Sequence, residues 1–76
     1  MDIVIVVDID HYSDGTVIEV SVLSCCYEPD IGFVEDPIKP TRSFKDGRKA
    51  DSYIKRTASS LKKNGHTVKI KHFERY

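Results

Sequence analysis

Two aspartates beside a Gly-Thr pair form a stretch whose residue types and spacing suggest chemistry. Residues 6–16 read VVDIDHYSDGT, so an apolar run ends in Asp8 and Asp10 and is soon followed by Gly15 and Thr16. Carboxylates two positions apart on a strand share one face, where they could hold a divalent cation or act on a bound substrate. The stretch therefore has two interpretations: a cation or phosphate site, or the acidic tip of a β-hairpin.

The Asp-x-Asp arrangement after an apolar strand resembles the first motif of haloacid-dehalogenase-type phosphatases. In that family the first aspartate attacks phosphorus and the second acts as acid and base beside Mg²⁺, so the resemblance implies these roles for Asp8 and Asp10. It covers these two residues and Thr16, and residues 11–14 intervene before Gly15. That family also needs a doubly wound sheet, which requires a much longer chain. A minimal Mg²⁺-dependent enzyme at Asp8 and Asp10 is therefore the third of three functional hypotheses.

Length and composition indicate one small domain spanning residues 1–76. No apolar run approaches the ~20 residues that cross a bilayer, and no basic region precedes the first strand. We therefore expect no membrane contact and a cytoplasmic location. The adjacent Cys25 and Cys26 would point to opposite faces of a strand, which disfavours a disulfide between them. The histidines and cysteines lack zinc-site spacing, so we expect no metal and no cofactor.

Alternation of apolar and polar residues predicts two N-terminal strands. The first covers residues 3–11 and the second residues 16–25, and both are rich in β-branched side chains. Asp14 and Gly15 between them are typical of a two-residue hairpin turn. A turn at these two positions places all the strongly apolar residues of the pair on one face of the sheet.

The same turn predicts that Asp10 lies opposite Glu19, where the like charges would repel each other. The final segment, residues 66–76, also alternates and predicts a strand. If this strand lies beside the first, Lys69 and Lys71 share the face of the acids and offset the repulsion. Pattern and charge therefore favour the spatial order second strand, first strand, last strand.

A helix is predicted between Asp46, a typical N-cap, and Gly65, a typical stop. Residues recur between them at i, i+3, i+4, i+7, i+8 and i+11, which predicts one buried stripe. The stripe comprises Ala50, Tyr53, Ile54, Thr57, Ala58 and Leu61.

The segment from 26 to 45 contains all three prolines and predicts irregular structure. A short edge strand near residues 32–34 or 41–44 is the alternative. Three apolar side chains are expected to anchor the segment to the core: Phe33, Ile38 and Phe44.

These elements predict an α+β fold. The expected sheet is mostly antiparallel, with three or four strands and one helix packed on one face. The order is β-β-α-β, or β-β-β-α-β if residues 31–44 contain a further strand.

Charge is strongly segregated along the chain although the formal total is zero. Residues 1–38 hold nine acids and no Lys or Arg, whereas residues 39–76 hold twelve bases and three acids. The predicted helix carries two rows of bases at a spacing of seven, on the side opposite its apolar stripe. The first row is Arg48, Lys55 and Lys62, and the second is Lys49, Arg56 and Lys63. This face is either simply solvated or meets a negatively charged partner.

The leading hypothesis is a small non-enzymatic interaction protein that binds and modulates, or inhibits, a macromolecular partner. The candidate contact surfaces are the basic helix face, the 26–45 segment and a free edge at the second or last strand. Separate acidic and basic surfaces favour a protein partner with an acidic surface, and they also allow a homodimer. By analogy, such chains are typical of accessory inhibitors from phages and mobile elements. The alternative is a nucleic-acid-binding module that uses the six bases of the helix.

Overall fold

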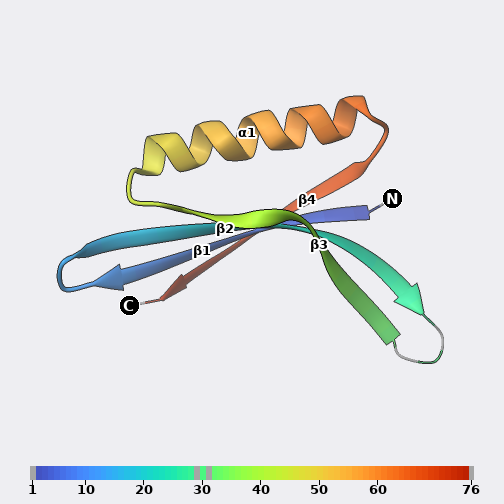
Figure 1. Ribbon diagram of the computed structural model, residues 1–76, viewed down its shortest axis with the longest axis horizontal. Helices are drawn as coiled ribbons and strands as arrows, with labels where there is room; N and C mark the ends of the chain where they lie inside the picture. The colour runs from blue at the N-terminus through green and yellow to red at the C-terminus, as the bar shows by residue number, and fades with distance from the viewer. Residues whose placement is uncertain (1, 29, 31, 76) are drawn as a thin grey trace.

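The structure, a computed structural model, describes residues 2–28, 30 and 32–75. Within these residues the chain forms four strands and one helix in the order β-β-β-α-β (Figure 1). The elements are β1 (Asp2–Tyr12), β2 (Gly15–Glu28), β3 (Gly32–Phe44), α1 (Gly47–Lys63) and β4 (Thr67–Arg75). The sheet order is β3-β2-β1-β4, with β1 and β2 antiparallel, β2 and β3 antiparallel, and β1 and β4 parallel. The predicted α+β class, the mostly antiparallel sheet and the placing of the last strand beside the first are confirmed.

The prolines of the 26–45 segment predicted irregular structure, and this prediction is wrong. Strand β3 spans Gly32–Phe44, and β2 extends to Glu28. The strand accommodates Pro37 and Pro40 because it is an edge strand, where a missing N–H breaks few ladder bonds. Register shifts opposite Val20, Val22 and Leu23 absorb the resulting irregularity. The second strand is therefore not an edge of the sheet. In Figure 1 the end of β2 and the start of β3 bend away from α1.

The register of the first hairpin differs by two residues from the prediction. Tyr12 pairs with Gly15, so the turn residues are Ser13 and Asp14, and Asp10 lies opposite Val17 rather than Glu19. Ser13 and Asp14 both keep negative φ, and Gly15 instead takes φ +145° at the start of β2. The predicted faces are nevertheless correct, because a slip of two residues leaves every side chain on its own side of the sheet.

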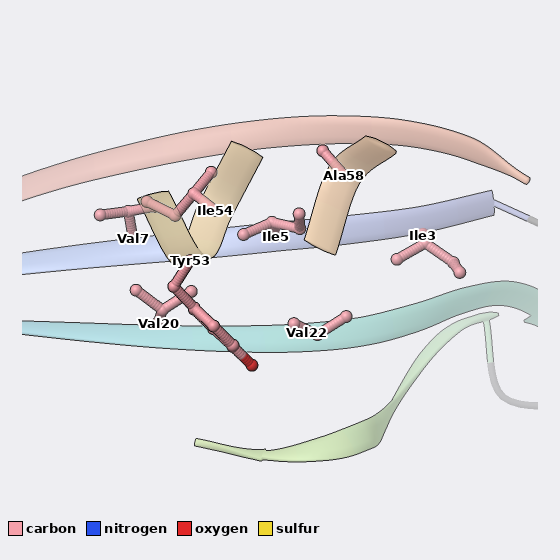
Figure 2. Close-up of a cluster of buried hydrophobic side chains, with 8 residues drawn as sticks. All are labelled: Ile3, Ile5, Val7, Val20, Val22, Tyr53, Ile54 and Ala58. Atoms are coloured by element: carbon pink, nitrogen blue, oxygen red, sulfur yellow. The ribbon is translucent and has the colours of Figure 1, made fainter. Parts of the chain in front are cut away.

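The hydrophobic core lies between α1 and one face of the sheet (Figure 2). Ile3, Ile5 and Val7 of β1 and Val20 and Val22 of β2 are each at most 2% exposed. Tyr53, Ile54 and Ala58 of α1 pack against them, and Leu61 covers the margin of this cluster. The predicted helical stripe is thus the buried face of α1.

The anchors predicted for β3 have different outcomes. Phe44 packs against the core, whereas Ile38 is 41% exposed because it lies between two shifted pairings at the edge of the sheet. The side chains of Phe33 and Cys26 lie outside the described part of the structure, and Cys25 is a free thiol.

Both predicted ends of the helix are observed. The Asp46 carboxylate accepts a hydrogen bond from the Arg48 backbone N–H at 2.9 Å and forms the N-cap. At the other end the N–H of Gly65 donates to the carbonyl of Lys62, and the N–H of His66 donates to that of Leu61. This pair of bonds is a Schellman motif, and it requires Gly65 to adopt φ +86°. No helix among the described residues is long and apolar enough to cross a membrane.

Gly65→Ala is expected to destabilise the protein by about 1–2 kcal/mol, because a Cβ makes the left-handed conformation unfavourable. The effect would come from the backbone alone, since a Cβ at this position would meet no atom within 4 Å. Urea denaturation measures it. Gly47→Ala is the matched control, because it also has open space around it but no positive φ. An unchanged midpoint for Gly65→Ala would contradict the assigned helix end.

The second face of the sheet is not covered by α1, and it mixes acids and bases. Asp8 lies directly opposite Glu19. Lys69 and Lys71 share this face, as predicted, but the parallel register aligns them with Val4 and Val6, so Arg75 is the base beside Asp10. We refer to this surface as the open face.

Candidate anion-binding groove

The six bases predicted on the helix are all exposed in α1. Their side chains radiate from the helix surface away from the buried stripe, as the spacing of seven implies. The guanidinium Nε of Arg56 donates to the backbone carbonyl of Ser52 at 3.4 Å, a long bond that leaves the other donors of Arg56 available.

Strand β3 adds two bases that the sequence pattern did not identify. Arg42 pairs with Val20 and Lys39 with Val22, so both lie on the face of the sheet that α1 covers. The guanidinium of Arg42 lies 4.8 Å from the ring centroid of Tyr53 and 5.2 Å from that of Phe44. These contacts are within the range of cation–π attraction. The two aromatic rings therefore fix the position of Arg42 beside the helix, and Arg42 remains exposed to solvent.

Three hollows lie along α1, and two of them lie at its boundary with β3. The first, of about 290 Å³, lies between Phe44 and Arg48, and the second, of about 270 Å³, lies between Lys39 and Ser60. The third, of about 380 Å³, lies on α1 itself beside Lys63. Arg56 borders all three, so the hollows surround its side chain.

We call these three hollows together the basic groove. Its helix side carries Arg48, Lys49, Lys55, Arg56 and Lys63. Its strand side carries Lys39 and Arg42. Lys62, the remaining base of the predicted set, borders none of the three hollows.

The electrostatics of the groove are uniform. Its lining contains seven bases and no Asp or Glu. Among the described residues, no carboxylate lies within 4.0 Å of any of these bases. Hydroxyl groups of Ser52, Ser59 and Ser60 lie between the bases and can donate further hydrogen bonds. The arrangement can therefore bind anionic oxygens, either carboxylates or phosphates.

The aspartates of the first strand occupy a different surface. Asp8 and Asp10 lie on the open face, away from α1. In the described part of the chain, no three His, Cys, Asp or Glu side chains gather as metal ligands would. At this end of the sheet His11 Nε2 lies 3.1 Å from Glu74 Oε2, and His11 Nδ1 lies 3.2 Å from the Thr16 hydroxyl. His11 therefore links β1, β2 and β4.

The fold and the groove define the chain only as a small two-layer α+β protein with an exposed basic groove. Comparison with protein-family models, with curated proteins and with solved structures finds no match to this chain.

Proposed function

We propose that this chain is a small non-enzymatic binding protein whose basic groove docks an acidic surface of a partner protein and so modulates that partner. One observation carries the proposal: seven bases line three hollows around Arg56 and have no described carboxylate within 4.0 Å. Like charges held this close repel one another, and a partner rich in carboxylates relieves that repulsion.

The distribution of charge supports a protein partner. The chain is neutral in total, and acids such as Asp8 and Glu19 lie on the open face, across the sheet from the groove. A molecule whose bases are concentrated in a groove on one side is oriented during its approach to an acidic protein.

The aromatic residues of the groove also favour a protein. Proteins that bind single-stranded nucleic acid present aromatic faces on which nucleobases stack. Tyr53 is only 8% exposed, and the guanidinium of Arg42 lies over the ring of Phe44. Neither ring therefore offers a bare face on which a nucleobase could stack. The surrounding Lys and Arg side chains, by contrast, need only anionic oxygens as partners.

Nucleic acid is the second candidate partner, and one observation favours it. Ser52, Ser59 and Ser60 alternate with bases along α1, and hydroxyls beside Lys and Arg are common contacts to a phosphate backbone. Such binding would be independent of base sequence, because the groove would contact phosphates alone.

Titration with two ligands of equal negative charge tests the proposal. The ligands are a glutamate-rich peptide and a single-stranded oligonucleotide, and binding is followed by fluorescence anisotropy. We expect the peptide to bind at least as tightly as the oligonucleotide, with NMR shift changes centred on Arg42, Lys49 and Arg56. A preference for the oligonucleotide of about tenfold or more would favour the second candidate. In that case the affinity should fall by about 0.7 log units per log unit of salt for each phosphate contacted.

A further inference from the structure

Strand β4 has one edge that no strand in the described part of the chain covers. It pairs with β1 on one side only and forms the end of the sheet. Its nine residues contain no proline and no register shift, so alternate backbone N–H and C=O groups face solvent in a regular row. The opposite edge strand, β3, contains Pro37, Pro40 and two register shifts that disrupt such a row. The free edge of β4 is therefore the better template for an additional strand.

Exposed apolar side chains flank this edge on both faces. Ile70 is 42% exposed and Phe73 is 49% exposed, and they are two of the four large apolar residues exposed in the described part of the chain. Ile70 aligns with Ile5 on the face that α1 covers, whereas Phe73 aligns with Asp8 on the open face. A strand added to β4 would place its own side chains beside both of them.

The charge of β4 restricts what this strand can be. Lys69, Lys71 and Arg75 all lie on the open face. Antiparallel pairing of β4 with a second copy of itself, centred on Ile70, sets Lys69 opposite Lys71. If the pairing is centred on Lys71, this residue lies opposite Lys71 of the second copy. If the pairing is centred on His72, Lys69 lies opposite Arg75 of the second copy. Each register puts like charges directly across the pair, which is destabilising.

We propose that the free edge of β4 accepts an extended segment of a partner protein in which carboxylates alternate with aliphatic residues. The carboxylates face Lys69 and Lys71 on the open face, and the aliphatic side chains cover Ile70 on the other face. The two lysines thus oppose pairing between copies and select an acidic strand. This site is separate from the basic groove, and the inference does not depend on the proposed function.

A peptide of alternating Glu and Val tests the inference, and a peptide of alternating Lys and Val is its control. The alternating pattern reads the same in both directions, so the orientation of the added strand need not be known. We expect the full chain to bind the Glu–Val peptide and not the Lys–Val peptide. Hydrogen exchange should slow in residues 67–75 on binding.

Variants separate this site from the groove. Lys69→Glu/Lys71→Glu should weaken binding of the Glu–Val peptide by about tenfold and create binding of the Lys–Val peptide, because two cross-strand attractions become repulsions. At saturating Glu–Val peptide, Arg56→Glu should leave the slowing of hydrogen exchange in residues 67–75 unchanged, because Arg56 borders the groove and does not lie on β4. Equal affinity for the two peptides, protection of α1 and β3 instead of β4, or an unchanged preference in the lysine variant would each overturn the proposal.

Discussion

Replacing Ile5 with alanine is expected to remove most of the stability of the fold. Ile5 is 0% exposed and lies in the centre of the core, between β2 and α1. Truncation of a fully buried isoleucine typically costs about 2–5 kcal/mol, because apolar contacts are lost and a cavity remains. A single core of this size supplies only about 3–5 kcal/mol in total. We therefore expect a substantial unfolded population of Ile5→Ala at 25 °C, measured by urea denaturation followed by circular dichroism.

Ile38→Ala is the matched control for this experiment. Ile38 has the same side chain, but it is 41% exposed on the edge strand β3. Its truncation should lower the free energy of unfolding by less than about 1 kcal/mol. Equal losses for the two variants would mean that the core is not centred between β1, β2 and α1.

The sequence predicts the faces of the first hairpin better than its pairing. Hydrophobic alternation assigns Ile5 and Val22 to the core side, and both lie there with 0% exposure. Alternation has a period of two, so it cannot distinguish registers that differ by two residues. The choice then depends on the turn, where Ser13 and Asp14 form the loop and Gly15 opens the next strand. Turn chemistry alone favoured the wrong pair of residues.

Only the helical half of the basic groove could be predicted from the sequence. The regular spacing of Lys49 and Arg56 identifies an exposed helical face without any tertiary information. Arg42 belongs to a segment that its prolines marked as irregular, so no face could be assigned to it. One indication was present, because Arg42 and Phe44 are two residues apart and share a face of any strand they form. That Arg42 also lies beside α1 depends on tertiary packing against Tyr53, which a local pattern does not contain.

Reversing two groove charges, Lys49→Glu/Arg56→Glu, is expected to weaken binding of the glutamate-rich peptide by about 30-fold. Both side chains are exposed and border the first hollow, and neither contributes to the core. The double variant changes the local charge by four units, and exposed charge pairs are worth about 0.5 kcal/mol each. The total of about 2 kcal/mol corresponds to the stated loss in affinity. Most of the effect should appear as slower association, because the groove charges steer an acidic partner toward the helix.

Lys45→Glu/Lys62→Glu distinguishes a groove from a general attraction between opposite charges. It produces the same change in net charge, but neither residue borders the three hollows of the groove. We expect this control to reduce peptide affinity by about threefold or less, because separated surface charges are largely screened at physiological salt. Both variants should retain the circular dichroism spectrum of the original chain, since all four positions are exposed. If the two double variants lose affinity equally, the convergence of bases between α1 and β3 is not what recognises the partner, and net charge alone governs the interaction.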